Sequence, residues 1–364
     1  MKSLNLPYSP RIDQLRWFAA TLVLLFHFSI KWRALGGGGL DTPWAGLINE
    51  GHTGVALFFT LSGFLFMRIA QFQHEIDYRR FVRNRLLRIV PLYLTVFLLA
   101  LSLQRDTFQP QDILYLVTAN LGNAPTSQNL VTGAAWCIPL EFMFYLAFPW
   151  LSRFALERGP RYLLQALALM LLFKLMLYQE SGQSTKMYFS TFVGRFDQFL
   201  MGMLAAMLYQ HHRELLHRCA GWLVLPTLVL ALCASALQAQ VAPFNGTPKA
   251  LFWSYWSLLE SLVWSTVIVA WVSWQGRLPA WLDRALVHGG KISFSFYLLH
   301  MGVVQMLAQT FGLPHWTGVG WLDAALALSV VYGLVWAVAT LSYHTIEAPF
   351  LRLRSAYGAA RGSQ

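Results

Sequence analysis

The chain has 364 residues, of which 56% are hydrophobic and 12% are charged. Soluble domains carry roughly 25% charged residues, so this composition excludes an ordinary soluble domain and indicates a membrane protein. The formal net charge of +11 does not indicate a nucleic-acid partner, because the Lys and Arg residues gather at the ends of apolar stretches. The three cysteines are scattered without a CxxC pair, which predicts neither a disulfide framework nor a metal site.

Ten stretches are candidates to cross a bilayer, which takes about 20 mostly apolar residues. They cover residues 12–31, 53–70, 86–104, 134–155, 161–179, 190–209, 220–238, 255–274, 291–312 and 321–343. Most of the 27 Lys and Arg residues fall at alternate ends of these stretches, which assigns both termini to the cytoplasm. The sequence therefore predicts an all-α polytopic membrane protein, a bundle of about ten transmembrane helices with both termini cytoplasmic. Residues 1–364 are expected to form a single integral-membrane domain, with its core at about 11–354 and no fused soluble domain.

The first stretch contains three ionisable residues, Asp13, Arg16 and His27. At about 100° per residue, the eleven steps from Arg16 to His27 return to within roughly 20° of the same direction, and Asp13 lies about 40° away. The three side chains therefore share one stripe, with Arg16 near the inner surface and His27 in the outer half of the membrane. Histidine suits general-base catalysis near neutral pH. The alternative is structural: Asp13 pairs with Arg16 at the interface, and His27 bonds a neighbouring helix.

Two later stretches also place polar groups where lipid would otherwise be expected. Glu141 lies within an aromatic-rich helix, where a carboxylate needs a donor or a cation, or stays protonated. In the ninth stretch, Ser293, Tyr297 and His300 follow one another at i, i+4 and i+7 and share a face. Glu141 is a candidate to orient a substrate hydroxyl or His27, while the face from Ser293 to His300 either lines an acceptor site or packs within the protein.

Five arginines stand within ten positions in the segment YRRFVRNRLLRIVP, between the second and third stretches. Such a basic segment is typical of any cytoplasmic loop, and anionic membrane lipids are one class of partner. Arg85 and Arg88 nevertheless lie on one helical side while Arg83 points elsewhere. This arrangement suits several phosphates of a single ligand.

Six blocks together resemble the integral-membrane acyltransferase type 3 family, whose bacterial members O-acylate surface and secreted sugars. In chain order they are RIDQLR with a histidine eleven residues after its last arginine, GVALFFTLSGFLF, FVRNRLLRIVPLY, WCIPLEFMFYLAFP, SFSFYLLH and YHTIEAPFLR. Residues of this chain that match family motifs are His27, Arg16, Arg83, Arg85, Arg88, Glu141 and Glu347. Two positions depart from the usual pattern: QL stands where many members have GL, and Ala56 occupies a position that is often acidic.

The resemblance implies an enzyme of the bacterial inner membrane that moves an acyl group, usually acetyl, from cytoplasmic acyl-coenzyme A to a hydroxyl of a carbohydrate. The acceptor would be a surface polysaccharide, a lipopolysaccharide or a glycolipid. Acyl-coenzyme A would be a co-substrate rather than a permanently bound cofactor, and a separate periplasmic protein would be a possible partner. By the same resemblance His27 is the essential histidine, acting as base or as acyl carrier, and Arg83, Arg85 and Arg88 belong to the donor site.

A second function class uses the same buried groups differently. A secondary transporter or flippase of a glycolipid or small polar substrate would employ them as a proton relay. That class predicts Gly- or Pro-broken helices in matching halves of the chain, and the sequence shows no such symmetry.

Overall fold

The computed structural model describes residues 5–39, 42, 45–73, 76–103, 105–107, 133–182, 188–243, 249–312, 314 and 316–357. Over these residues the chain forms helices and connecting turns, with no strand, which confirms the all-helical fold class. The longer helices are α1 (Pro10–Ala34), α3 (Thr53–Gln73), α4 (Tyr78–Leu103), α6 (Cys137–Arg158), α7 (Pro160–Glu180), α9 (Phe192–His211), α10 (Arg213–Val241), α11 (Phe252–Ser273), α12 (Ala280–Phe311) and α13 (Gly320–Ser342). The shorter elements are α2 (Gly46–Asn49), a 3-10 turn (Arg105–Thr107), a π-helical turn (Tyr343–Glu347) and α14 (Ala348–Leu351).

Each of the ten predicted stretches overlaps one of the ten longer helices. Within the part of the chain that the structure describes, seven candidate spans are both long and apolar enough to cross a membrane: α3, α4, α7, α10, α11, α12 and the continuous segment Gly320–Leu351. The other three, α1, α6 and α9, have 25, 22 and 20 residues and are not among these candidates. The structure thus shows a multi-pass helical protein, and a count of ten crossings stays a prediction.

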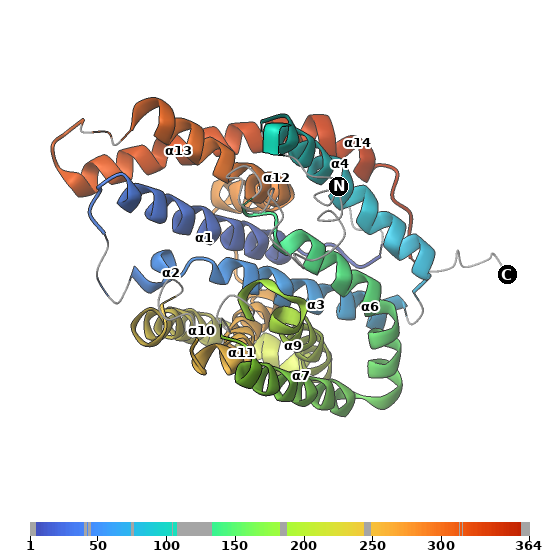
Figure 1. The fold of residues 1–364 in the computed structure, drawn as a ribbon. Coiled ribbons are helices and arrows are strands. Elements are labelled where there is room, and N and C mark those ends of the chain that lie inside the picture. Colours follow the sequence, from blue (N-terminus) through green and yellow to red (C-terminus); the bar gives the residue numbers. More distant parts are fainter. Residues whose placement is uncertain are drawn as a thin grey trace.

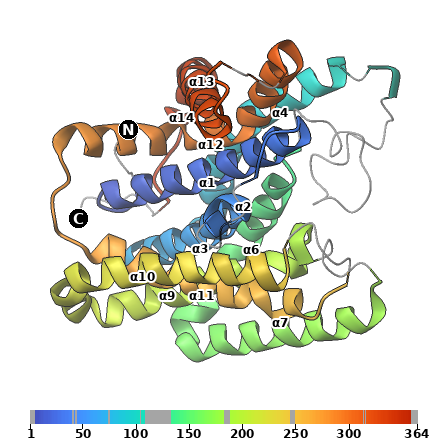
Figure 2. The same cartoon turned by 90° about the vertical axis from the view of Figure 1, so that its left-hand side faces the viewer.

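Helices α1 and α3 occupy the middle of the bundle. Figures 1 and 2 show α4, α12 and α13 on one side of this pair and α7, α9, α10 and α11 on the other. Glycines allow the closest contacts between helices: a Cβ added at Gly202 of α9 would lie 1.9 Å from the carbonyl oxygen of Thr60 of α3, and one at Gly290 of α12 would lie 2.2 Å from that of Asp13 of α1. Small residues of this kind let membrane helices approach backbone to backbone. The second contact presses the start of α1 onto α12.

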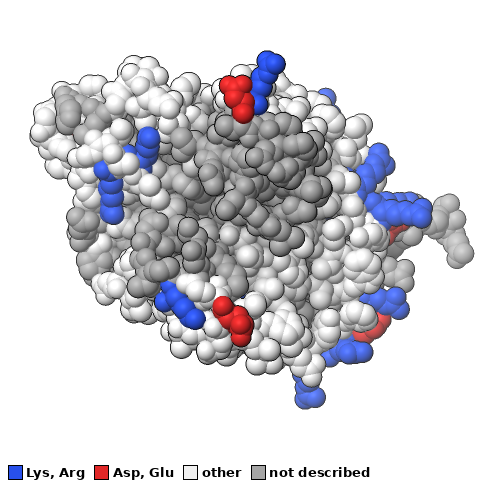
Figure 3. Space-filling view, in the orientation of Figure 1, with Lys and Arg blue, Asp and Glu red and all other residues white. Residues whose placement is uncertain are grey.

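Aromatic side chains fix the other side of α1. The ring centroid of Trp17 lies 4.5 Å from that of Phe296 of α12 and 4.8 Å from that of Trp336 of α13, and both pairs are edge to face. Such pairs add to the stability gained by burial. Both chain ends lie toward the right of Figure 1, and Figure 3 shows many of the visible Lys and Arg residues along that margin. This side is called the terminal end below, and the opposite end of α1 the far end.

Candidate active site

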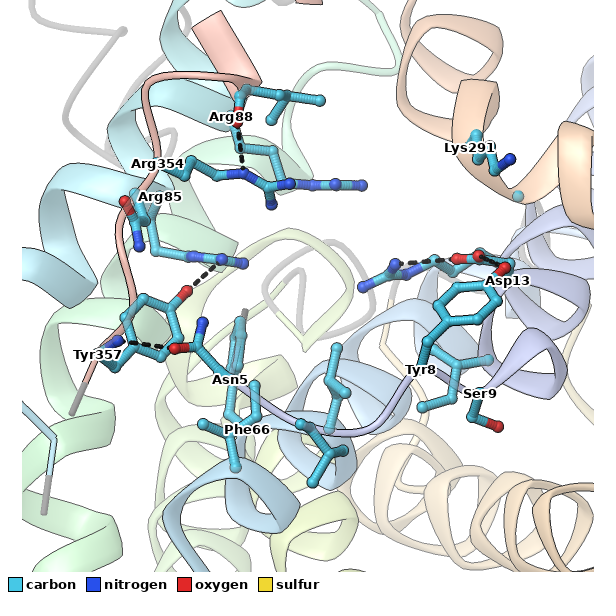
Figure 4. Close-up of a pocket in the computed structure, with 18 of the residues that line it drawn as sticks. Asn5, Tyr8, Ser9, Asp13, Phe66, Arg85, Arg88, Lys291, Arg354 and Tyr357 are labelled. Carbon is cyan, nitrogen blue, oxygen red and sulfur yellow. Dashed lines mark hydrogen bonds and ion pairs between the residues drawn. The ribbon is translucent and has the colours of Figure 1, made fainter. Parts of the chain in front are cut away.

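A cavity of about 160 Å³ opens at the terminal end of the bundle (Figure 4). Residues 5–9, the first turns of α1, and parts of α3, α4, α12 and the segment after α14 line it. Its charged lining residues are Asp13, Arg16, Arg85, Arg88, Lys291 and Arg354. Because five of these six side chains are cationic, the cavity is suited to a ligand with several negative charges.

One wall of this cationic pocket is held by α1. Arg16 Nη1 lies 3.4 Å from Asp13 Oδ1, and the Tyr8 hydroxyl donates to Asp13 Oδ2 at 2.8 Å. Burial, with a contribution from the Asp13 carboxylate, raises the pKa of Tyr8, so its hydroxyl stays protonated and donates. Asp13 therefore already has two partners, and one of them is Arg16.

The opposite wall combines α4 with the C-terminal segment. Arg85 is 7% exposed, donates to the Tyr357 hydroxyl and lies 5.0 Å from the ring centroid of Phe66. Burial and the neighbouring guanidinium groups of Arg88 and Arg85 lower the pKa of Arg354 to about 10. Arg354 thus stays charged at neutral pH although like charges surround it. A bound polyanion would offset this repulsion.

The two chain ends meet beside this wall. The Tyr357 backbone N–H donates to Asn5 Oδ1 at 2.7 Å, and Gln73 Nε2 donates to the Asn5 carbonyl oxygen at 3.0 Å. Asn84 of α4 exchanges two hydrogen bonds with the backbone of Ser355, at 2.6 and 3.1 Å. These contacts hold residues 355–357 against the pocket.

Arg83, the third arginine expected to hold the donor, does not line the cavity. Its side chain is exposed, whereas Asn84 and Arg85 next to it are buried. The helical register explains why Arg83 is exposed while Arg85 is buried, since two residues along a helix turn the side chain by about 200°. The structure therefore brings Arg16, Arg85 and Arg88 together and leaves Arg83 outside this group.

His27 lies on α1 about 16 Å beyond Arg16, as eleven residues of helix require. Its Nδ1 is 3.0 Å from the Val23 carbonyl oxygen and 3.0 Å from Nε2 of His300 on α12. The Nδ1 of His300 in turn lies 2.5 Å from the Tyr297 carbonyl oxygen. Carbonyl oxygens only accept, so these partners assign a hydrogen to Nδ1 of both rings. The single hydrogen on Nδ1 of His27 is then shared between the Val23 carbonyl oxygen and Nε2 of His300, and His27 keeps a lone pair on its own Nε2, the form that a general base requires.

The remaining predicted site residues take up structural contacts in this conformation. Glu141 Oε1 accepts from the Ser62 hydroxyl at 3.2 Å and from the Tyr145 hydroxyl; neither partner is His27. The Tyr297 hydroxyl donates to the Ala134 carbonyl oxygen at 2.6 Å, and the Ser293 hydroxyl to the Gly290 carbonyl oxygen at 2.9 Å. The structure therefore joins His27 to His300 and sets Glu141 in a separate hydrogen-bonded group.

Glu347 lies on the π-helical turn and is 1% exposed. It accepts from the Ser295 hydroxyl of α12. π-helical turns inside α-helices are frequent at functional sites. Here the turn directs a carboxylate of the IEAP segment into the bundle.

Two groups escaped the sequence analysis. The first comprises Tyr8, Lys291, Arg354 and Tyr357, which complete the cationic pocket; the basic run after IEAP was the available signal. The second is a pair of buried ion pairs joining α7, α9 and α11: Lys174 Nζ to Asp197 Oδ2 at 2.6 Å, and Arg195 Nη1 to Glu260 Oε2 at 3.3 Å. Charges in membrane spans generally pair in the bundle interior, so these residues could have been singled out.

Gln14, which stands where many family members have glycine, has a structural role. Gln14 Nε2 donates to Asp283 Oδ1 at 2.6 Å, and Gln14 Oε1 accepts from Trp271 Nε1 at 3.0 Å. A glycine there would make neither bond. This side chain therefore ties α1 to α11 and α12 next to the pocket.

The chain is similar to a known protein family and to several of its relatives. The family profile described as "Acyltransferase domain" (Acyl_transf_3) matches residues 9–341. YrhL of Bacillus subtilis, named as a candidate peptidoglycan O-acetyltransferase, is 24% identical over 94% of this chain and 55% of its own length. The O-acetyltransferase OatA of Staphylococcus aureus is 27% identical over 57% of this chain and 36% of its own length. The acyltransferase MdmB of Streptomyces mycarofaciens is 26% identical over 94% of this chain and 92% of its own length.

The chain thus spans about half of YrhL and about a third of OatA. No solved structure matches it significantly. The family profile nevertheless covers the pocket-lining residues of α1, α3, α4 and α12 and both histidines of the pair, whereas the lining residues from Tyr343 onward lie beyond the match. The chain is a multi-pass membrane protein, and it belongs to the integral-membrane acyltransferase type 3 family.

Proposed function

We propose that this protein transfers an acyl group, acetyl in the simplest case, from acyl-coenzyme A to a hydroxyl of a carbohydrate. The cationic pocket is the observation that supports acyl-coenzyme A as the donor. Coenzyme A bears three phosphate groups, and the pocket offers Arg16, Arg85, Arg88, Lys291 and Arg354 around one cavity. Guanidinium groups bind phosphate through charge-assisted, often bidentate hydrogen bonds.

The pocket also supports an orientation in the membrane. Acyl-coenzyme A is a cytoplasmic metabolite, so the terminal end would face the cytoplasm of a bacterial inner membrane, and the far end would face outward. The concentration of Lys and Arg at the terminal end fits the positive-inside rule. The acyl-bearing arm of the donor would then extend along α1 toward His27.

In the proposed reaction His27 acts as general base. Its Nε2 takes the proton of the acceptor hydroxyl while that oxygen attacks the thioester carbonyl carbon. The tetrahedral intermediate collapses by breaking the C–S bond, and the proton on His27 passes to the departing coenzyme A thiolate. Transfer thus forms one ester and one thiol, with no net gain or loss of protons. His300 holds the His27 ring in the required tautomer.

The acceptor class is supported by the relatives. YrhL and OatA carry the name O-acetyltransferase, and the name of YrhL specifies peptidoglycan. The two names share O-acetylation, which is ester formation on a hydroxyl, and we extend this chemistry to the present chain with a sugar hydroxyl as the proposed acceptor. A separate periplasmic protein is a proposed partner for delivering the acetylated product.

The test uses the protein in lipid nanodiscs with radiolabelled acetyl-coenzyme A, together with mass spectrometry of surface glycans from cells with and without the gene. The proposal expects saturable donor binding that weakens with ionic strength and a base-labile acetyl mass shift that depends on the gene. Identical glycans in both cell types would refute the sugar acceptor. Donor-independent flux of a sugar or glycolipid across vesicles, without acyl incorporation, would instead identify a transporter.

A further inference from the structure

A second cavity, of about 180 Å³, lies at the far end of α1, between α1, α12 and α13. Its lining is almost entirely apolar: Phe28, Trp32, Leu307, Phe311, Ala327 and Val330 contribute to it. The charged side chain in the lining is Lys31. This apolar groove differs in kind from the cationic pocket, which could not hold a hydrocarbon chain.

The groove starts one helical turn beyond the histidine pair. Lys31 follows His27 by four residues on α1, and Val304 follows His300 by four residues on α12. Residues four apart lie on the same face of a helix, about 6 Å apart along its axis. Both helices that carry a histidine therefore continue directly into the groove, so a molecule bound there lies within about one helical turn of the histidine pair.

The rim of the groove has the chemistry of a membrane interface. Trp316 lines it and is 58% exposed, and Trp32 of α1 also belongs to the lining. Trp and Lys residues favour the level of lipid headgroups. Among the described residues no carboxylate forms an ion pair with Lys31, so its ammonium group is available to an anion at that level.

We propose that this groove binds the hydrocarbon chain of a membrane-anchored acceptor, a sugar joined to the chain through a phosphate. The phosphate pairs with Lys31, and the sugar is placed over His27. This inference rests on the proposed function, because it assigns the acceptor of that reaction. It explains why an apolar groove with a single cation lies beside a buried base: the anchor and the phosphate fix the sugar, so the reacting hydroxyl need not be found by free diffusion.

The experiment uses two probes in nanodiscs, each with a photoactivatable group in its chain: hexadecyl glucosyl phosphate and neutral hexadecyl glucoside. We expect the phosphate probe to label α1, α12 or α13 at the groove. Lys31→Gln should weaken labelling by the phosphate probe about tenfold, as expected for a lost charged contact, and leave labelling by the glucoside unchanged. Ala308→Phe, which fills the groove from α12, should reduce labelling by both probes.

Ala325→Phe is the matched control, because Ala325 is exposed on α13 and does not line the groove. Equal labelling by both probes in the unmodified protein, or equal competition by excess phosphatidylglycerol, would overturn the proposal and identify the groove as an ordinary lipid site. Unchanged labelling of Ala308→Phe would also overturn it. Acetyl-coenzyme A binding is measured on the same samples: its absence in the unmodified protein contradicts the donor assignment, whereas its presence without groove labelling contradicts the groove alone.

Discussion

The hydrogen bond between His27 and His300 leads to a quantitative prediction. Removing a general base lowers turnover by about 10²- to 10⁴-fold, so His27→Ala should fall in that range. His300 touches no proposed substrate and acts through its 3.0 Å bond to His27. A hydrogen bond of this kind contributes about 0.5–1.5 kcal/mol, so His300→Ala should lower turnover by roughly 2- to 13-fold.

The measurement is a double-mutant cycle on acetyl transfer from acetyl-coenzyme A in nanodiscs. Once His27 is gone, there is no ring left for His300 to position, so the double variant should be no slower than His27→Ala alone. His288 supplies the control, because it lies on α12 like His300 but its Nε2 bonds Thr340 Oγ1 at 3.3 Å. His288→Ala should therefore retain turnover. Additive effects of the two substitutions, or a loss in His300→Ala as large as that in His27→Ala, would refute the positioning role.

Three further predictions concern the pocket and the packing. Arg85→Gln should raise the KM for acetyl-coenzyme A roughly ten- to hundredfold with little change in kcat, since a charged contact to phosphate is lost, as steady-state kinetics would show. Lys174→Met should destabilise the protein by about 3–5 kcal/mol, because Asp197 is left buried without its cation; thermal unfolding in detergent measures this. Gly202→Leu should destabilise it by about 1–3 kcal/mol through overpacking against α3, detected by the same method.

Each of these predictions has a matched control. Arg83→Gln removes an equal charge from the same helix outside the pocket, and a KM increase as large as that of Arg85→Gln would contradict the assignment of the donor site. Lys174→Met combined with Asp197→Leu should recover much of the lost stability, and no recovery would exclude the ion pair as the cause. A Cβ at Gly221 meets no atom within 4 Å, so Gly221→Leu should leave the Tm close to that of the unmodified protein.

The helices were predictable because apolar stretches of membrane length leave the backbone little choice but a helix. That Asp13 and Arg16 share one side of α1 was equally predictable, since both lie on one helix and its periodicity fixes the angle between their side chains. The contact of His27 with His300 was not predictable from the sequence, because the two residues are 273 positions apart and only helix packing brings them together. The same holds for Arg354, which reaches the pocket through the turn after α14.

Glu141 shows a different limit of sequence reasoning. A buried carboxylate was expected to find a partner, and it did, but the partners are Ser62 and Tyr145 rather than a histidine. The choice among nearby donors depends on the rotation and depth of α6 relative to α3. Neither quantity is encoded in a local pattern.

The contacts between the two chain ends carry a consequence for biosynthesis. Residues 355–357 leave the ribosome after all ten of the longer helices, yet Tyr357 forms part of the pocket wall and bonds Asn5. The first helices can insert while the donor site still lacks Arg354 and Tyr357. A nascent chain in the membrane therefore has an incomplete cationic pocket until residues 354–357 have been synthesised and have reached α4.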